Sequence, residues 1–313
     1  MRASVITVTM NPALDKTVTV DGIALARLNR IKEVRMDAGG KGINVAKVLR
    51  GFQVDVAAWG IAGGYQGRLI QDKLQAQGIP CFFLEGAGET RVNMKVVDES
   101  TKLTTEFNEP GVEVNGSQLA QFTDRFLQGI AGVSYVVLGG SLPPGAPSGY
   151  YRTLIEAAAA KNVPVILDAD GEALAQGMEA APYAVKPNIH ELENYFGCRL
   201  QDDREIVNAA RSLIAAKGVQ LVQVSMGGNG SILVDGQEAH RAKPFPIVPV
   251  STVGAGDSMV AAMVYGLLHQ LPLSDISRLT SAAGTITASK AGTQVCTIQE
   301  VKEKQDSVEL IPI

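Results

Sequence analysis

The chain has 313 residues, of which 46% are hydrophobic and 19% are charged. This length and composition allow a large buried core, in one large domain or a domain plus an appendage, and argue against a disordered chain. The net charge of -4 gives no electrostatic reason to expect nucleic acid or an anionic membrane as a partner. A bound anion would therefore have to be held by local groups.

The cysteines and the N-terminal segment bear on the compartment. Cys81, Cys198 and Cys296 are far apart and lack CxxC spacing, which argues against a disulfide framework and against a zinc site. The N-terminus is strand-like without the apolar region of a signal peptide, and no stretch approaches the roughly 18 apolar residues of a membrane span. We therefore expect a cytoplasmic protein.

The first third of the chain mixes two kinds of pattern. Residues 17–20 and 93–97 alternate as strands with one covered face do, and an α/β stretch lies between them at 42–77. We expect two extended excursions, roughly 12–36 and 88–108, to meet as a small β-sheet lid on the main body.

From about residue 130 onward, short apolar runs alternate with helical patterns. This rhythm predicts a mainly parallel sheet with helical crossovers, and no internal repeat or Pro-rich linker divides residues 1–313 into separate domains. The expected strands are 135–138, 163–168, 183–186, 221–224 and 231–234, and the expected helices are 150–161, 189–196, 203–217, 257–269 and 274–290.

The common phosphate-binding motifs are absent. The sequence contains neither Gly-x-x-x-x-Gly-Lys-Ser/Thr nor Gly-x-Gly-x-x-Gly, so it has no P-loop and no dinucleotide fingerprint. Glycine-rich turns at strand-to-helix junctions remain, where free backbone N–H groups at a helix N-terminus can hold an anion.

The glycine-rich segment at 251–258 opens an apolar helical run. Its small residues Gly254, Ala255 and Gly256 let the backbone approach a phosphate, and their amides can stabilise the charge of a transferring phosphoryl group. Asp257 falls in the first turn, where it can accept the proton of an attacking hydroxyl or simply cap the helix. The segment by itself does not choose between these roles.

A second glycine-rich segment precedes the helical pattern that begins near residue 42. Gly39, Gly40 and Gly42 would bring main chain against a sugar, and Lys41 would meet its anionic end. Asn44 is a poor helix former at a position that invites a ligand contact. An ordinary turn with a solvated lysine is the alternative.

Two later segments follow predicted strands. Asn188 and Glu191 lie three residues apart on one helical face, where Glu191 could hold hydrated Mg²⁺ or could form a capping box with Asn188. The glycine-rich turn after residue 225 could serve a nucleotide or could be an ordinary hairpin turn. His190 is expected to face solvent.

Together these segments resemble the PfkB carbohydrate kinases of the ribokinase superfamily. The segments that carry the resemblance are 39–46, 186–191 and 253–258, and their order, their spacing and the chain length all match. The resemblance implies a ribokinase-like three-layer α/β/α fold with a β-sheet lid, ATP and Mg²⁺ as cofactors, and a homodimer formed through the lids. It assigns the anion hole and base to Gly254, Ala255, Gly256 and Asp257, the nucleotide side to Lys186, Asn188, Ser225, Gly227, Gly230 and Ser251, and Mg²⁺ to Glu191.

Within that family, residues 9–15 resemble the 1-phosphofructokinase and tagatose-6-phosphate kinase branch. The branch implies that Asp15 binds sugar hydroxyls and that Arg30, Arg91 and Ser141 meet the substrate phosphate, together with Gly39, Gly40, Lys41 and Asn44 around the sugar. Paired guanidiniums suit a phosphorylated sugar better than a neutral one, although exposed lid arginines without a ligand are the alternative.

The resemblance implies phosphorylation of fructose 1-phosphate to fructose 1,6-bisphosphate. Tagatose 6-phosphate and fructose 6-phosphate are the alternative substrates, because a β-furanose of fructose is nearly two-fold symmetric about its ring oxygen. A nucleoside or neutral-sugar kinase is a further alternative, and so is a binding protein that has lost the chemistry. The intact segment around Asp257 argues against the last.

Overall fold

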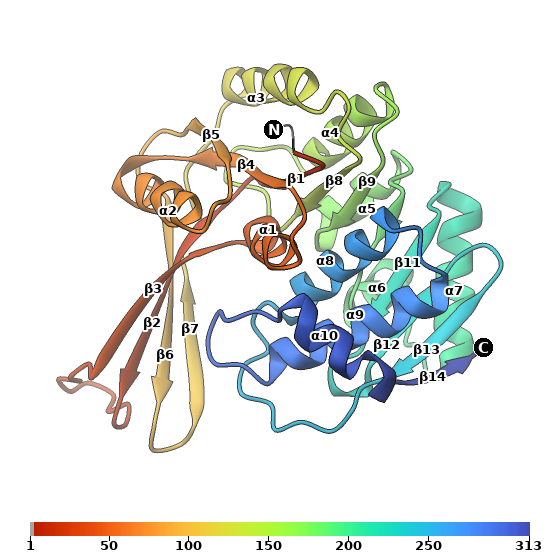
Figure 1. Cartoon of the computed structure of the whole chain (residues 1–313). Coiled ribbons are helices and arrows are strands. Elements are labelled where there is room, and N and C mark those ends of the chain that lie inside the picture. Colours follow the sequence, from red (N-terminus) through yellow and green to blue (C-terminus); the bar gives the residue numbers. More distant parts are fainter. Residues whose placement is uncertain (1–2) are drawn as a thin grey trace.

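The structure is a computed structural model that describes residues 3–313, and it contains two separate sheets (Figure 1). Neighbouring strands of the main sheet pair in parallel from β11 to β5, and the remaining strands extend one edge in antiparallel fashion. In spatial order the main sheet comprises β14 (Glu309–Pro312), β13 (Ala239–Lys243), β12 (Ser231–Val234), β11 (Leu221–Ser225), β10 (Ala184–Val185), β9 (Val165–Asp168), β8 (Tyr135–Gly139), β1 (Val5–Thr9), β4 (Val56–Ala62) and β5 (Cys81–Glu85).

Helices cover both faces of the main sheet. Those packed on one face are α3 (Gly116–Gly129), α4 (Tyr150–Ala159), α5 (Gly171–Met178), α6 (Ile189–Phe196) and α7 (Asp203–Lys217). Those on the other face are α1 (Lys41–Gly51), α2 (Gly64–Ala76), α8 (Ala255–Leu268), α9 (Leu273–Ala288) and α10 (Ile298–Lys304). Two short 3-10 turns complete the assignment, η1 (Gly227–Asn229) and η2 (Gln305–Ser307).

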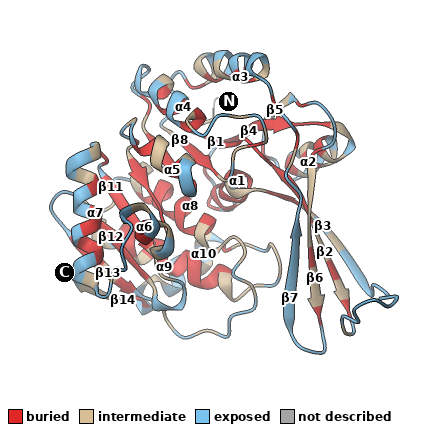
Figure 2. Ribbon diagram, turned by 180° about the vertical axis from the view of Figure 1, so that it is seen from behind, coloured by how far each residue is buried: buried red, intermediate tan, exposed pale blue. Residues whose placement is uncertain are grey.

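The central strands are buried on both faces, which explains their continuous apolar runs. In β8, Val136 and Leu138 join the core under α3–α7, whereas Val137 between them joins the core under α1, α2 and α8–α10. This alternation places one apolar layer on each side of the sheet. The central strands are accordingly coloured as buried in Figure 2. The three-layer α/β/α fold expected from the sequence is therefore confirmed.

The small sheet stands beside this body and runs β3 (Glu33–Gly39), β2 (Ala13–Val20), β6 (Arg91–Asp98), β7 (Leu103–Asn108). Its register puts alternate residues on opposite faces. One face carries Asp15, Asp37, Asn93, Lys95 and Glu106, and the other carries Val18, Val34, Met36, Met94 and Phe107. The sheet is thus polar toward the body and apolar on the outside.

Three helices of the main body match their sequence patterns closely. The patterns at 189–196 and 203–217 coincide with α6 and α7, and the helix expected from 257 begins two residues earlier, at Ala255. Within residues 3–313, no helix is both long enough and apolar enough to cross a membrane.

Candidate active site

A polar cavity of about 260 Å³ lies between the polar face of the small sheet and the carboxyl ends of β1 and β8. Ligand sites are expected at this edge of a parallel sheet, because the loops that follow the strands meet there. Its lining residues are Thr9, Asn11, Asp15, Gly40, Lys41, Asn44, Arg91, Asn93, Lys95, Glu106, Asn108, Gly140, Ser141, Asp170, Val253, Gly254 and Asp257. The cavity has the size and polarity that a sugar requires.

Asp257 lies in the first turn of α8 at the floor of this cavity. The helix is preceded by Gly254 in the left-handed conformation (φ 78°), and the Asp257 side chain makes no capping hydrogen bond. Its Oδ2 instead accepts a hydrogen bond of 2.8 Å from Asn44 Nδ2 on α1. Asp257 therefore does not cap the helix, which was the alternative that the sequence left open.

The surroundings of Asp257 change its acidity. Burial, reinforced by the negative charge of Asp168, raises the pKa of Asp257 to about 6, while Asn44, Lys41 and Lys186 oppose the shift. A carboxylate with a pKa in this range binds a proton more readily than an exposed aspartate does, yet it is largely ionised at neutral pH. Asp257 has the protonation behaviour that a general base needs.

Two lysines converge on one buried carboxylate next to Asp257. Lys41 Nζ lies 2.9 Å from Asp168 Oδ1, and Lys186 Nζ lies 3.4 Å from Asp168 Oδ2. Burial opposes the ionised form of Asp168, but the two ammonium groups outweigh it and hold its pKa below the usual value. The same contact raises the pKa of Lys41 despite the burial of that side chain. Asp168 and Lys41 are therefore both charged.

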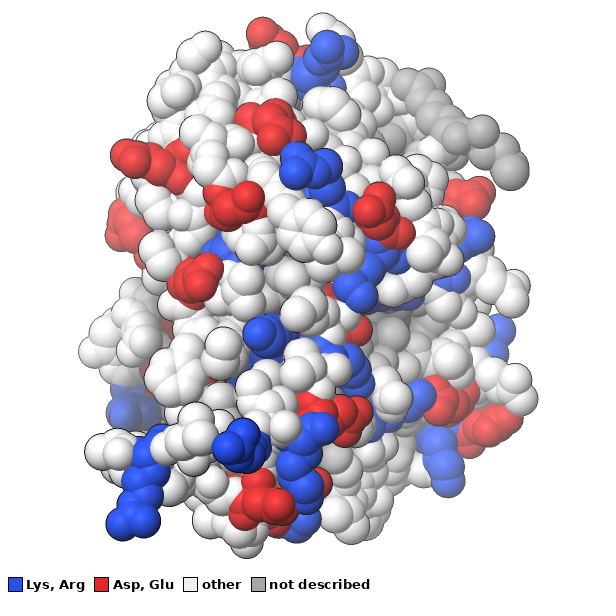
Figure 3. Space-filling view, turned by 90° about the vertical axis from the view of Figure 1, so that its left-hand side faces the viewer, with Lys and Arg blue, Asp and Glu red and all other residues white. Residues whose placement is uncertain are grey.

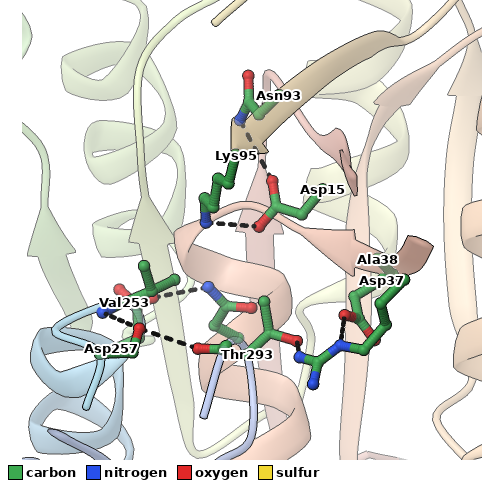
Figure 4. Close-up of polar contacts among 12 residues, drawn as sticks. Asp15, Asp37, Ala38, Asn93, Lys95, Val253, Asp257 and Thr293 are labelled. Atoms are coloured by element: carbon green, nitrogen blue, oxygen red, sulfur yellow. Dashed lines mark hydrogen bonds and ion pairs between the residues drawn. The ribbon is translucent and has the colours of Figure 1, made fainter. Parts of the chain in front are cut away.

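Asp15 is fixed at the other side of the cavity by the small sheet. Its carboxylate accepts from Asn93 Nδ2 at 3.3 Å and lies 3.4 Å from Lys95 Nζ (Figure 4). A Cβ at Gly39 would come within 2.5 Å of the Asp15 carboxyl carbon, and Gly40 has φ 115°. Glycine at these two positions therefore makes room for Asp15 and for the turn into α1.

Arg91 and Ser141 meet at Asn11 in the wall of the polar cavity. The Arg91 guanidinium donates to the Asn11 carbonyl at 2.9 Å, and the Asn11 side-chain amide donates to Ser141 Oγ at 3.4 Å. Burial lowers the pKa of Arg91, and its Nε has no protein partner. An incoming anion would satisfy both the charge and the free donor.

A second, more apolar cavity of about 810 Å³ lies on the other side of the segment 254–256. Ala255 and Gly256 line it together with four residues that the family resemblance assigned to the nucleotide, namely Asn188, Ser225, Gly227 and Gly230. The remaining walls are Gly228, Ser231, Pro244, Phe245, Pro246, Ile247, Pro249, Thr252, Met259, Ser281, Gly284, Thr285 and Ala288. The segment 254–256, to which the family resemblance assigned an anion hole, therefore stands between the two cavities.

The glycine-rich turn after β11 is both a hairpin and a cavity wall. β11 and β12 pair in antiparallel fashion around η1, as the hairpin alternative predicted. Gly230 has φ 89°, and a Cβ there would come within 2.1 Å of the Ala242 carbonyl oxygen. The tight turn keeps the backbone of this segment against the second cavity.

The comparisons with known proteins agree with this geometry. The model of the pfkB family carbohydrate kinases matches residues 8–300. The chain belongs to this family. It is 38% identical over 287 residues to a 1-phosphofructokinase of Xanthomonas campestris, with 90% of each chain covered. It is 33% identical over 316 residues to a 1-phosphofructokinase of Escherichia coli K12, covering 100% of this chain and 99% of that one.

Solved structures of the family share the fold over almost the whole chain. Phosphofructokinase-2 from Escherichia coli in complex with fructose-6-phosphate superimposes with a TM-score of 0.91 at 28% identity, covering 97% of this chain and 99% of that one. The pfkB family membership makes this chain an ATP-dependent carbohydrate kinase, and its relatives act on sugar phosphates.

Some predicted site residues of the kinase lie outside the two cavities. Arg30 is exposed on the loop between β2 and β3 and lines neither of them. Ser251 lines a third cavity of about 880 Å³ under the small sheet, where its hydroxyl donates to the Gly292 carbonyl at 3.2 Å. Lys186 is buried behind the segment 254–256, and Gly39 packs against Asp15.

Glu191 and Asn188 form the capping box that the sequence offered as an alternative to a metal site. Glu191 Oε2 accepts from the Asn188 N–H at 2.8 Å, and Asn188 Oδ1 accepts from the Glu191 N–H at 2.9 Å. This arrangement occupies one carboxylate oxygen and leaves Oε1 available. His190 is exposed, as expected.

Sequence reasoning missed several side chains that the kinase brings into the site. The most prominent are Asp168, Asn11, Asn93 and Lys95. Asp168 ends a predicted parallel strand, which is a position where functional groups gather, so its place in the sequence carried a usable signal. Lys95 and Asn93 carried none of their own, since only the register of β6 against β2 turns them toward Asp15.

Proposed function

We propose that this kinase transfers the γ-phosphoryl group of ATP to the free hydroxymethyl group of fructose 1-phosphate, giving fructose 1,6-bisphosphate and ADP. The observation that carries the proposal is the position of Asp257, a buried carboxylate with a pKa of about 6, at the junction of a polar cavity and a nucleotide-sized cavity. The 1-phosphofructokinases among its relatives support the choice of sugar.

The chemical step assigns one task to each group around the transfer point. Asp257 accepts the hydroxyl proton while the hydroxyl oxygen forms a bond to the γ-phosphorus. The bond from that phosphorus to the bridging oxygen breaks, and ADP leaves with the bonding electron pair. The backbone amides of Gly254, Ala255 and Gly256 at the start of α8 stabilise the negative charge on the transferring group.

The polar cavity holds the sugar phosphate between the body and the small sheet, which acts as a lid. Asp15, Gly40 and Asn44 orient the ring hydroxyls, and Arg91 with Ser141 binds the phosphate that the sugar already carries. We also assign Arg30, which lies on the loop between β2 and β3, to this phosphate, which it would reach by closure of the lid. On the nucleotide side we assign Lys186, Asn188, Ser225, Gly227, Gly230 and Ser251 to the ATP phosphates and ribose.

We also propose that Mg²⁺ accompanies ATP beside Glu191. The free Oε1 of Glu191 is a hard oxygen donor, and within residues 3–313 no cluster of three or more acidic, His or Cys side chains forms a dedicated metal site. A single carboxylate oxygen fits an ion that is held largely by phosphate oxygens and water. When bound, the ion neutralises phosphate charge and orients the γ-phosphoryl group. We place the reaction in the cytoplasm, in keeping with three free thiols.

A comparison of acceptors tests the proposed reaction. ADP release by the purified protein, measured by a coupled assay, is expected to give the highest kcat/KM with fructose 1-phosphate. Tagatose 6-phosphate and fructose 6-phosphate present a similar ring with the phosphate at the other end, so they are the competing substrates. A higher kcat/KM with either of them, or ADP release only with unphosphorylated fructose, would contradict the proposal.

The pH dependence of the rate follows from the acidity of Asp257. Because the base must be ionised, kcat/KM is expected to fall tenfold per pH unit below about 6, the pKa to which burial and Asp168 raise this carboxylate. An unperturbed aspartate would keep the rate constant down to about pH 4. The measurement is a kcat/KM profile from pH 5 to 9 in constant ionic strength, and a flat acidic limb would argue against Asp257 as the base.

The outer face of the small sheet supports a homodimer formed through the lids. This face carries Val34 at 48% exposure and Phe107 at 60%, and the adjoining loop adds Leu25 at 88%. On the side of the molecule where this sheet lies, acidic and basic side chains are interspersed with uncharged surface (Figure 3). Exposed apolar patches of this kind mark interfaces, and a second copy of the same sheet presents a matching apolar face.

Phe107→Asp is expected to convert such a dimer to a monomer, because a carboxylate would be buried in an apolar contact. Light scattering coupled to size-exclusion chromatography measures the mass. Thr104→Asp adds the same charge to the same strand but on the opposite face, so it is the matched control and should remain dimeric. A monomeric wild-type protein, or equal behaviour of the two variants, would rule out this interface.

A further inference from the structure

Three cations line the polar cavity; Lys95 is paired with Asp15, and the other two, Arg91 and Lys41, belong to two separate groups. Arg91 reaches Asn11, which in turn contacts Ser141. Lys41 instead pairs with Asp168, which also faces Lys186 from the nucleotide side. A sugar that carries one phosphate needs only one of these two cationic groups to bind that phosphate. The second group is therefore available for a different anion.

Asp168 is built into the body as the centre of the second group. It ends β9, its side chain is 2% exposed, and its Oδ2 has Lys186 at 3.4 Å and no hydrogen-bond partner. The two oxygens point to lysines from different elements, Lys41 at the start of α1 and Lys186 just after β10. A single rigid carboxylate thus fixes the ends of two long side chains that would otherwise lose entropy on binding a ligand.

The two lysines approach the transfer point from its two sides. Lys41 lines the polar cavity together with Gly254 and Asp257. Lys186 Nζ lies 3.4 Å from the position that a Cβ on Gly256 would occupy, directly behind the anion-binding segment. The two ammonium groups are therefore next to the two ends of the segment 254–256, which separates the two cavities and which the γ-phosphoryl group would pass on its way from nucleotide to sugar.

The summed charge of the four ionisable groups also favours a transferring phosphoryl group beside Lys41. Lys41 and Lys186 are positive while Asp168 and Asp257 are negative, so the four groups are neutral before reaction. When Asp257 accepts the hydroxyl proton, the group gains one net positive charge. That gain coincides with the arrival of the negatively charged phosphoryl group, which is the state that catalysis must stabilise.

We propose that Lys41 stabilises the transferring phosphoryl group, not the phosphate that the sugar already carries, and that Asp168 is the positioning residue that holds Lys41 and Lys186 on either side of it. This inference rests on the proposed sugar-phosphate kinase reaction, and it revises the role that sequence reasoning gave to Lys41. The bonds made and broken are those of the proposed reaction, and neither lysine exchanges a proton.

Lys41→Met separates the two possible roles of Lys41. Loss of one stabilising group for the transferring charge is expected to lower kcat by about 100-fold or more. The dissociation constant for fructose 1-phosphate, measured by calorimetry without nucleotide, should change by less than about threefold because Arg91 and Ser141 remain. Lys161→Met, on the exposed surface after α4, is the control for loss of a lysine charge. Weaker sugar-phosphate binding with unchanged kcat would overturn the proposal.

Asp168→Asn tests the positioning role of Asp168. Its readout is the pH dependence of kcat/KM, which would not change if Asp168 only stabilised the fold. The charged groups facing Asp257 are Asp168 on β9, Lys41 and Lys47 on α1, and Lys186 after β10. The substitution removes the negative charge of Asp168, which raises the pKa of Asp257. It should therefore lower kcat and also move the acidic limb of the kcat/KM profile to lower pH. A thermal unfolding midpoint that falls while kcat and the pH limb stay unchanged would mean a merely structural role.

The activity of the wild type tests the proposed function, whereas the phenotype of Lys41→Met tests the role of Lys41. If wild type releases no ADP with any ketohexose phosphate, the proposed function is wrong. If wild type is active and Lys41→Met loses sugar-phosphate affinity as strongly as Arg91→Ala does, the function stands and the assignment of Lys41 falls. Should Asp168→Asn not fold, Lys41→Met alone decides the question.

Discussion

Asp257→Asn is expected to lower kcat by roughly a thousandfold or more while the KM values for ATP and fructose 1-phosphate change by less than about threefold. The amide keeps the shape of the side chain and can still accept a hydrogen bond from Asn44, which lies 2.8 Å away. It cannot accept the hydroxyl proton. Initial-rate kinetics by coupled ADP release measures both quantities, and near-normal turnover would falsify the assignment of the base.

The same variant is expected to be at least as stable as the wild type above pH 6. Burial raises the pKa of Asp257 from its ordinary 3.8 to about 6, so the protonated form stabilises the fold. That contribution is fully present below about pH 4 and is lost as the pH rises through about 6, because the wild type must then bury a charge. The asparagine variant carries no such cost. Thermal unfolding at pH 5 and pH 8 should show its relative advantage growing with pH.

Asp275→Asn is the matched control for this variant. Asp275 occupies the first turn of α9 at the same distance from the helix start as Asp257 has in α8, but it is exposed. If Asp257 acted only through the helix dipole, both substitutions would have the same small effect of a few tenths of a kcal/mol on unfolding. Unchanged kcat in Asp275→Asn, beside a large loss in Asp257→Asn, separates a base from a favourable helix charge.

Much of the fold followed from the sequence because its elements are long, regular and locally encoded. Helices α6 and α7 begin after Asn188 and Asp202, whose side chains cap them, and end at Gly197 and Gly218 in the left-handed conformation. These start and stop signals are readable without tertiary information. The antiparallel edge strand β14 was not predicted, since a four-residue strand at a sheet edge has no periodicity to detect.

The site was predictable only where its residues belong to continuous segments. Gly254 to Asp257 form one turn, so a possible anion site could be inferred from the segment, while the family resemblance was needed to choose a base over a helix cap for Asp257. Asp168 ends β9 and Asn11 lies between β1 and β2, and their partners Lys41 and Arg91 are 127 and 80 positions away in the chain. Only the packing of β1, β8 and β9 brings them together. Lys41 illustrates the same limit, because its neighbours in sequence do not reveal that it pairs with Asp168.

Arg91→Ala is expected to raise the KM for fructose 1-phosphate by roughly 10- to 100-fold, the loss typical of a hydrogen bond to a charged group. The KM for ATP should stay unchanged, because Arg91 lines only the polar cavity. Arg91→Lys keeps the charge but not the planar fork, so its KM should fall between those of the alanine variant and wild type. Rates measured over a range of fructose 1-phosphate concentrations give these values.

The same substitution discriminates a phosphorylated acceptor from a neutral one. Unphosphorylated fructose has no anion for Arg91 to bind, so wild type and Arg91→Ala should phosphorylate it equally poorly, and the difference between the two proteins should appear only with the phosphorylated sugar. Arg68→Ala, on the exposed side of α2, controls for loss of a guanidinium. Because Arg91 also donates to the backbone of Asn11, thermal unfolding of the variant must match wild type for the comparison to hold. An unchanged KM in a correctly folded Arg91→Ala would place the substrate phosphate elsewhere, and Lys41 and Lys95 would then be the remaining cations that line the cavity.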